Sequence, residues 1–311
     1  MSLSTSLLRP AIVRVAHHPW ARRFVTGTPP GRAVASRFVA GETLADAMAV
    51  ARDLHGHGIR TMLDHLGEHV TTPEQALGAR EAYLSALEAS AAAPDVDPAV
   101  SVKLTQLGLD ESIEACWANL LPIVAAARER GSVLMIDMEE SIYVDRTLEI
   151  AARAHAEYAA AGVAIQAALR RSERDLFALA PGTRIRLVKG AYLEPEEIAF
   201  TSKREVDASY ARLFATSWAR GHPVDVATHD PRLIEGVRAR VEAAPEGWGR
   251  VEIQMLYGVR RDLQSQLAGR DVPVRVYIPY GTEWYPYLTR RLVERPANVW
   301  FFVSNLMRTS R

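Results

Sequence analysis

An alternation of short apolar runs with longer helical patterns begins after Gly58 and continues almost to the end of this 311-residue chain. Each apolar run ends in a polar residue and is followed by a stretch rich in Ala, Leu, Glu and Arg, which is typical of successive βα units. The runs predict eight strands: Ile59–Asp64, Val100–Leu104, Val133–Met138, Ala164–Ala168, Arg184–Val188, Val224–Ala227, Val251–Met255 and Val274–Ile278. The helices predicted between them include Pro73–Ala92, Ile113–Arg130, Val144–Ala161 and Leu233–Ala244. We therefore predict an α/β fold, a closed (βα)8 barrel of the TIM type.

A doubly wound open sheet is the alternative architecture. It is less favoured because no G-x-G-x-x-G turn follows any of the predicted strands. The pattern before Gly58 is helical, basic and interrupted by glycine and proline, so we divide the chain into a helical N-terminal arm, residues 1–58, and a barrel domain, residues 59–311.

Charge and cysteine content exclude some classes of protein. The 37 basic and 37 acidic residues cancel, which argues against a general nucleic-acid binder. The single cysteine, Cys116, lies in an apolar helical pattern and is expected to be a buried structural thiol in a reducing compartment. Because no apolar run is long enough to span a membrane, and Met1–Arg14 lacks the order of a secretory signal, we expect a cytoplasmic protein.

The barrel fold predicts that functional groups gather where the parallel strands end, at one rim. Polar residues recur at those ends: Asp64, Lys103, Asp137, Gln166, Arg186, Lys189, Thr228, His229, Gln254 and Tyr277. Any one of them is also an ordinary polar residue of a strand end or a barrel core. Their recurrence at one rim favours a functional site.

The last strand leads into a helix that carries two adjacent arginines. Pro279 and Gly281 end the strand, and Tyr285–Glu294 is predicted to be helical, with Arg290 and Arg291 side by side in the sequence. Because the side chains of neighbours on a helix diverge by about 100°, the two arginines could line different parts of one pocket that binds an anion. The alternative is two solvated surface arginines.

Five separated motifs resemble one known family. The motifs are RIRLVKGAY at 184–192, SVKL at 101–104, IDMEE at 136–140, ATHD at 227–230 and YLTRRLVE at 287–294. Together they closely resemble the proline dehydrogenase family. The resemblance covers nearly all of the chain after Gly58. It implies a barrel that binds FAD and oxidises L-proline to 1-pyrroline-5-carboxylate. Since the chain stops soon after the eighth helix, it looks like the monofunctional form.

The resemblance also implies roles for individual residues. Arg290 and Arg291 become the clamp for the substrate carboxylate, with Lys103 as a further cation, because guanidinium forks give bidentate hydrogen bonds to a carboxylate. Arg186 matches the arginine beside the reactive part of the flavin, and Asp137 matches a catalytic acid. We infer that cations keep Asp137 ionised, so that it organises Lys103 and Arg186. The substrate pocket is completed by Tyr277 and Tyr287.

The implied cofactor contacts are mostly at the ends of the middle strands. They are Met138, Gln166, Arg186, Lys189, Gly190, Ala191, Thr228 and His229, with Glu294 as a ribose partner; no metal is expected. Gly190 suits such a contact because the absence of a side chain lets a flat ring or a phosphate approach the backbone. We expect electrons to pass to a quinone, and the apolar stretch Trp300–Met307 either contacts a membrane transiently or packs on the barrel.

Three other functions are compatible with this fold. A Schiff-base aldolase would use Lys103 or Lys189, whose pKa nearby cations would lower. A metal-dependent hydrolase would use Asp137, Glu139, Glu140 and His229, although adjacent glutamates point in different directions. A non-enzymatic barrel would only bind an amino acid.

Overall fold

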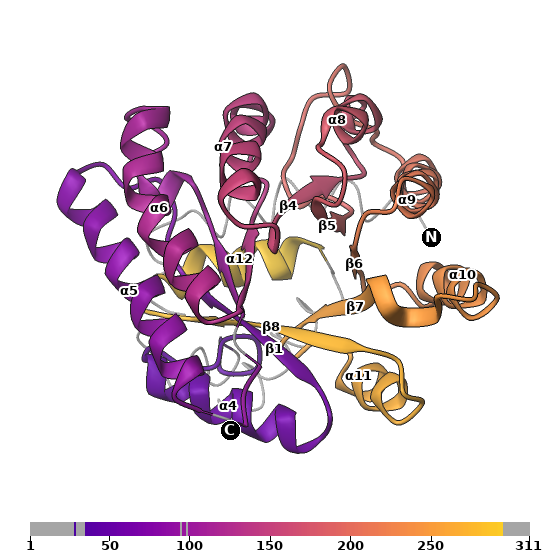
Figure 1. The fold of residues 1–311 in the computed structure, drawn as a ribbon, viewed down its shortest axis with the longest axis horizontal. Coiled ribbons are helices and arrows are strands. Elements are labelled where there is room, and N and C mark those ends of the chain that lie inside the picture. Colours follow the sequence, from indigo (N-terminus) through magenta and orange to yellow (C-terminus); the bar gives the residue numbers. More distant parts are fainter. Residues whose placement is uncertain (1–27, 29–34, 94, 98, 295–311) are drawn as a thin grey trace.

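The computed structural model describes residue 28 and residues 35–93, 95–97 and 99–294. A closed barrel of parallel strands, β1 to β8 in sequence order, forms its centre (Figure 1). The strands are β1 (Arg60–His65), β2 (Ala99–Val102), β3 (Val133–Ile136), β4 (Ala161–Gln166), β5 (Arg184–Val188), β6 (Val224–Ala227), β7 (Val251–Leu256) and β8 (Val274–Tyr280). The predicted fold class is confirmed.

Helices surround the barrel, except for α12 (Trp284–Glu294), which lies across one of its ends (Figure 1). The surrounding helices are α4 (Leu44–Gly56), α5 (Pro73–Ala91), α6 (Ile113–Glu129), α7 (Val144–Glu157), α8 (Ser172–Ala178), α9 (Lys203–Ala219), α10 (Pro231–Glu242) and α11 (Arg261–Ala268), with 3-10 turns at Thr105–Leu107, Ser141–Tyr143 and Gly247–Arg250. Several begin at a side-chain cap: Thr72, Ser112 and Ser202 each accept a hydrogen bond from a backbone N–H in the first turn. Such caps fix where a strand-to-helix loop ends.

The main hydrophobic core lies between the outer face of the sheet and the helices. Its members include Leu63, Val100 and Ile136 from strands, and Leu120 from α6. Cys116 of α6 is buried in this core, and its thiol donates to the Leu104 carbonyl oxygen at 3.5 Å. The predicted burial of this thiol is therefore confirmed.

Strand boundaries differ from prediction mainly at β4. The sequence predicted a strand at Ala164–Ala168 after a helix reaching Ala161, but α7 ends at Glu157 and β4 starts at Ala161. The Ala-rich stretch favours a helix locally, and barrel closure overrides that preference. A Cβ added to Gly162 would lie 2.6 Å from the Arg184 carbonyl oxygen, so the close approach of β5 requires glycine there.

Two other strands end earlier than predicted. β2 stops at Val102 and β3 at Ile136, so Lys103 and Asp137 lie just past their strands rather than within them. Both residues therefore belong to the loops at the carboxyl rim. The bounds of β5 and β6 agree with the prediction.

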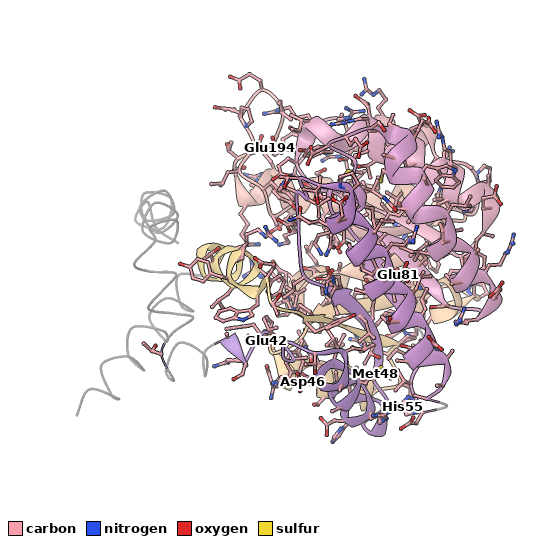
Figure 2. The ribbon with its side chains drawn as sticks, turned by 90° about the vertical axis from the view of Figure 1, so that its left-hand side faces the viewer. Glu42, Asp46, Met48, His55, Glu81 and Glu194 are labelled. Atoms are coloured by element: carbon pink, nitrogen blue, oxygen red, sulfur yellow. The ribbon has the colours of Figure 1, made fainter. Side chains whose placement is uncertain are left out.

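The part of the N-terminal arm that the structure describes packs onto the barrel. Ala47, Met48 and Ala51 of α4 are buried in the same core as the barrel strands. Figure 2 shows Met48 and His55 on this helix beside the barrel. The division of the chain at Gly58 stays a prediction, because a shared core does not by itself set a domain boundary.

Helix α12 lies across one end of the barrel, apart from the outer ring (Figures 1 and 2). Trp284 and Leu288 pack with Phe38 and Leu66, and the Trp284 indole donates to Glu42 at 3.2 Å. The helix predicted at Tyr285–Glu294 is thus observed with one more residue at its start. Its position brings the arginine-bearing helix to the rim where the strands end.

Candidate functional site

Side chains from β1, β8 and the end of β2 meet at the carboxyl rim. The Lys103 ammonium donates to Asp64 Oδ1 at 2.5 Å and to the Tyr277 hydroxyl at 3.2 Å. Asp64 is fully buried and Lys103 is 6% exposed. The predicted convergence of these strand ends is therefore present in the structure.

Asp137 connects this group to Arg186. Arg186 Nη1 donates to Asp137 Oδ1 at 2.5 Å, and the Tyr277 hydroxyl donates to Asp137 Oδ2 at 2.8 Å. Ser101, which sequence reasoning missed, donates to Asp137 at 2.9 Å and accepts from Arg186 at 2.8 Å. Lys103 lies 3.7 Å from the same carboxylate. One carboxylate thus holds two cations in fixed positions.

Gln254 fixes the other side of Arg186. Its Oε1 accepts from Arg186 Nε at 2.8 Å, and its Nε2 donates to Glu252 at 2.8 Å. Glu252 in turn accepts from Arg275 at 2.6 Å. Because strand residues two apart share a face, Gln254 and Glu252 continue the rim network down into the barrel.

The charges at the rim shift the pKa values of their neighbours. Burial raises the pKa of Asp137, but Arg186 and Lys103 outweigh burial and hold that pKa below its usual value. Burial opposes the charge on Lys103, yet Asp64 and Asp137 raise its pKa. Asp64 itself has a pKa raised to about 6, because burial outweighs the attraction of Lys103. These shifts favour an ionised Asp137 and a charged Lys103 at neutral pH.

The ionisation of Lys103 bears on the aldolase alternative. A Schiff-base lysine needs a lowered pKa, and the charged groups nearest to Lys103 are carboxylates, not cations. Lys189 is also paired, with Asp207 at 2.6 Å and Asp230 at 3.1 Å. The geometry therefore disfavours both lysines as nucleophiles.

Arg290 of α12 is bound by a glutamate that the sequence did not single out. Its Nη1 donates to Glu68 Oε2 at 2.7 Å and its Nη2 donates to Glu68 Oε1. The guanidinium also lies over the Tyr192 ring, 5.9 Å from the centroid. The alternative of a solvated surface arginine is wrong for Arg290, which is 24% exposed and bidentately paired. The side chains of Arg291 and Glu294 lie outside the described part of the structure.

Tyr287 and Tyr277 lie in different surroundings. Tyr287 is 5% exposed and packs in the cluster of Phe38, Leu66 and Trp284, whereas Tyr277 lies inside the barrel mouth. Arg186 lies over the Tyr277 ring at 5.3 Å from the centroid. Tyr277 joins the charged network, through hydrogen bonds with Lys103 and Asp137.

The loop after β5 carries Gly190 and Ala191, which are both exposed. Gly190 has φ of 109°, and an added Cβ would lie 3.1 Å from Gln166 Oε1. The Gln166 amide donates to the carbonyl oxygens of Met138 and Glu139, at 3.1 and 2.7 Å. Gln166 therefore holds the loop after β3 while its oxygen faces Gly190.

The side chains of Thr228 and His229, in the loop after β6, each accept a hydrogen bond from a backbone N–H group. Thr228 Oγ1 accepts from the Asp230 N–H at 3.2 Å, and His229 Nε2 accepts from the Leu256 N–H at 2.9 Å. The first contact lies within the loop after β6, and the second joins that loop to the end of β7. They leave the roles of the two residues toward a ligand as predictions.

One group of possible metal ligands occurs among the described residues, and it is not the predicted one. His69, Glu139 and Glu140 offer ligand atoms within 4.8 Å of one another. Neither Asp137 nor His229 belongs to it, so the set of ligands named for a hydrolase does not assemble. Glu139 is instead held by the Thr105 N–H at 3.0 Å and the Thr105 hydroxyl at 2.5 Å.

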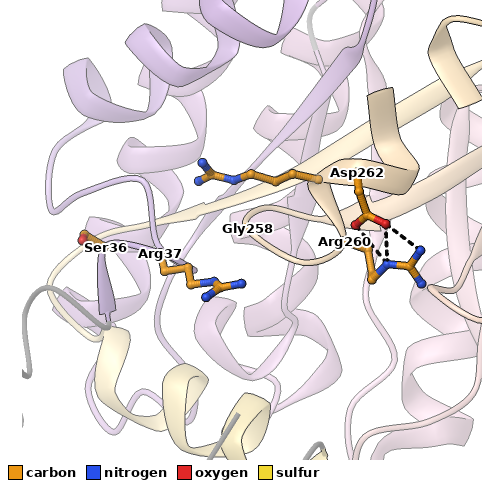
Figure 3. A pocket seen from close by; sticks show the side chains of 6 residues that line it. Ser36, Arg37, Gly258, Arg260 and Asp262 are labelled. Atoms are coloured by element: carbon orange, nitrogen blue, oxygen red, sulfur yellow. Dashed lines mark hydrogen bonds and ion pairs between the residues drawn. The ribbon is translucent and has the colours of Figure 1, made fainter. Parts of the chain in front are cut away.

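A surface pocket of about 500 Å³ lies elsewhere, between residues 36–37 and the start of α11 (Figure 3). Its lining is Ser36, Arg37, Gly258, Arg260, Arg261 and Asp262. Arg260 and Asp262 pair with each other at 2.8 Å. None of the predicted site residues lines it, so the connected side chains of the rim identify the site better than this pocket does.

No helix within the described ranges is long and apolar enough to cross a membrane. The stretch Trp300–Met307 lies outside the described residues, and membrane contact through it stays a prediction.

Comparison with known proteins gives a consistent result. Residues 47–303 match the family model described as proline dehydrogenase. The chain is 39% identical over 310 residues to a proline dehydrogenase of Deinococcus radiodurans, covering 97% of this chain and 98% of that one. It is 34% identical over 271 residues to proline dehydrogenase 2 of Bacillus subtilis, covering 87% and 89%.

A solved structure of similar fold is proline utilization A (PutA) from Bdellovibrio bacteriovorus inactivated by N-propargylglycine. The TM-score is 0.77 with 26% identity, over 85% of this chain and 33% of that one. The match to the family model and the identity to relatives over nearly their whole length agree, and the chain therefore belongs to the proline dehydrogenase family.

Proposed function

We propose that this enzyme oxidises L-proline to 1-pyrroline-5-carboxylate with FAD as its bound cofactor, and that the electrons pass to a quinone. Family membership gives proline oxidation; the cofactor, the product and the acceptor are our proposal. The observation that carries it is the fixed position of Arg186 at the barrel mouth, between Asp137 at 2.5 Å and Gln254 at 2.8 Å.

The residues at the rim suit a flavin. An FAD bound there would supply the ring that takes up a hydride. Arg186 offers a rigid cation, which stabilises negative charge on a reduced ring. Gly190 has no Cβ and a φ of 109°, so the backbone after β5 is open to a flat ligand. The residues named as FAD contacts in the sequence analysis, Lys189 among them, would hold this cofactor.

The substrate would lie between the barrel mouth and α12. Lys103 and the arginines of α12 bind and orient the carboxylate, and Tyr277 forms a wall against the ring. Asp137 keeps three side chains in place. It accepts hydrogen bonds from Arg186 and Tyr277, and it forms an ion pair with Lys103. Glu68 and the substrate carboxylate then compete for Arg290, because Glu68 already accepts hydrogen bonds from both terminal nitrogens, Nη1 and Nη2, of the Arg290 guanidinium.

Anaerobic spectroscopy tests the proposal directly. The purified protein should be yellow, with a flavin spectrum that L-proline bleaches in one step and D-proline does not. A soluble quinone should restore the colour faster than dissolved oxygen does. A colourless protein that binds proline would favour the binding-only barrel, and a requirement for nicotinamide cofactors would exclude flavin as the first acceptor.

We keep the expectation of a cytoplasmic protein that contacts a membrane only to exchange electrons with a quinone. Co-sedimentation with lipid vesicles, with and without L-proline, tests that contact.

A further inference from the structure

Asp64 is a buried carboxylate at the end of β1 that no role in the reaction accounts for. Its Oδ1 accepts from the Lys103 ammonium at 2.5 Å. Its Oδ2 is buried and has no hydrogen-bond partner among the described residues. A buried charge with half of its acceptor capacity unused is costly, so its retention at the rim requires an explanation.

Lys103 is the cation that Asp64 serves. The charged or titratable groups that act on Lys103 come from several elements around it. They are Asp64 and His65 from β1, Glu68 from the loop after β1, Asp137 and Glu139 from the loop after β3, and Tyr277 from β8. Asp137 is shared with Arg186, which lies closer to it. Asp64 is therefore the carboxylate that pairs with Lys103 and is not shared with Arg186.

We propose that Asp64 is a positioning residue that keeps Lys103 charged and aimed at the space where the substrate carboxylate binds. This inference rests on the proposed function. Removal of Asp64 lowers the pKa of Lys103, because burial disfavours the ammonium form and the more distant Asp137 and Glu68 remain to oppose it. An uncharged amine attracts a carboxylate far less than an ammonium does. Asp64 thus acts on substrate binding without touching the substrate.

The predicted consequence is a change in the pH range over which carboxylates bind. In the parent, Asp64 and Asp137 raise the pKa of Lys103, so the lysine stays charged up to and beyond pH 9.5. In Asp64→Asn the Lys103 pKa falls, and the proton leaves as pH rises through the lowered value. Carboxylate affinity should then fall with rising pH in the variant only.

Titration calorimetry with the flavin-loaded protein measures this. The probe is cyclopentanecarboxylate, which has the ring and carboxylate of proline but no amine to titrate or oxidise. We expect the parent Kd to change less than twofold between pH 7 and 9.5. In Asp64→Asn the Kd should rise about tenfold per pH unit above the new Lys103 pKa, as one linked proton requires. Flat binding in both proteins would overturn the proposal.

Two further variants separate positioning from general support of the fold. Asp64→Asn combined with Lys103→Arg should restore flat pH dependence, because a guanidinium keeps its charge throughout this range. Asp225→Asn is the matched control: Asp225 is equally buried and also paired, with Arg184 at 2.7 Å, and the charges that act on it are Arg184, Glu252 and Arg186, not Lys103. Its loss should lower stability and leave the pH profile of binding unchanged.

A third measurement leaves Asp64 intact, in case its variants do not fold. Lys103→Met leaves the buried Asp64 carboxylate without its cationic partner, so the pKa of Asp64 should rise beyond the parent value of about 6. A raised folded-state pKa adds stability as pH falls, and the unfolding free energy of Lys103→Met, relative to parent, should increase from pH 9 to pH 6. A difference that is constant with pH would show that the two residues are not coupled.

Failure of the proposed function looks different. A parent protein that is not bleached by L-proline would refute the flavin-dependent reaction. A parent that is bleached, with an Asp64→Asn variant that binds carboxylate equally at all pH values, would refute only the role of Asp64.

Discussion

Glu68 in the loop after β1 holds the guanidinium of Arg290 on α12 through both of its carboxylate oxygens. The pair is only partly exposed, with 15% of the Glu68 side chain and 24% of the Arg290 side chain open to solvent. It joins the helix that crosses the barrel mouth to the first strand-to-helix loop. A carboxylate of the protein thus occupies the fork that we assign to a carboxylate of the substrate.

The first prediction is that Glu68 and Arg290 are energetically coupled. Glu68→Ala should lower the free energy of unfolding by about 1–3 kcal/mol, because a charged, bidentate hydrogen bond is lost and Arg290 is left without its partner. In an Arg290→Ala background the same substitution should cost far less. Denaturant unfolding of the two single variants and the double variant gives the coupling energy, and additive losses would show that the pair contributes nothing.

The second prediction concerns substrate binding by Arg290. Arg290→Lys keeps the charge but loses the fork, so kcat/KM for L-proline should fall by the equivalent of roughly 1.5–3 kcal/mol, mainly through KM. Turnover should fall less, unless the ring also moves relative to the reacting carbon.

Pyrrolidine, which lacks the carboxylate, is the control substrate for this variant. It should be a poor substrate for the parent enzyme, and its kcat/KM should change little in Arg290→Lys. Equal losses for proline and pyrrolidine would mean that Arg290 supports the position of α12 and does not contact the substrate.

The third prediction is that Arg186 sets the reduction potential of the bound flavin. Arg186→Met removes the cation and keeps much of the side-chain volume, so the potential should become more negative, since reduction adds negative charge to the ring. Spectroelectrochemical titration of the flavin-loaded proteins measures it.

Arg238→Met is the matched control for Arg186→Met. Arg238 lies on α10 and pairs with Glu235 at 2.7 Å, in the outer ring of helices. Its loss should leave the potential near the parent value. If Arg186→Met does the same while it still binds flavin, Arg186 does not face the cofactor.

The fourth prediction is a pH dependence of stability caused by Glu139. Burial raises the pKa of this carboxyl from 4.5 to about 7, although hydrogen bonds from Thr105 oppose the rise. A folded-state pKa above the unfolded one favours folding when the group is protonated. Its contribution is complete below pH 4.5 and is lost as pH rises to about 7, by up to about 3 kcal/mol.

Glu139→Gln removes this titration and keeps the shape. The stability of the variant relative to parent should therefore increase between pH 4.5 and 7 and level off above that range. Urea unfolding at several pH values measures the difference. A constant difference would show that Glu139 titrates in the folded protein as it does in the unfolded chain.

The sequence alone determined the fold and the residues that gather at the rim. Short segments with apolar residues at alternate positions, several of them β-branched, such as Arg184–Val188 and Val224–Ala227, specify strands locally, and both have the predicted bounds. Parallel strands in a closed barrel all end on one side, so Lys103, Asp137, Arg186 and Tyr277 were predicted to meet there and do so. Local sequence failed at β4, where alanine favours a helix but barrel closure requires a strand.

Only the tertiary structure decided which charges pair. Lys103 and Asp64 are 39 residues apart, and Arg290 and Glu68 are 222 apart. The first pair depends on the register between β1 and β2, since a shift of one residue would turn either side chain to the other face of the sheet. The second depends on where α12 docks, which Phe38, Leu66 and Trp284 determine through apolar packing. No pattern within a single segment records either arrangement, because each is fixed by contacts between segments that are distant in the sequence.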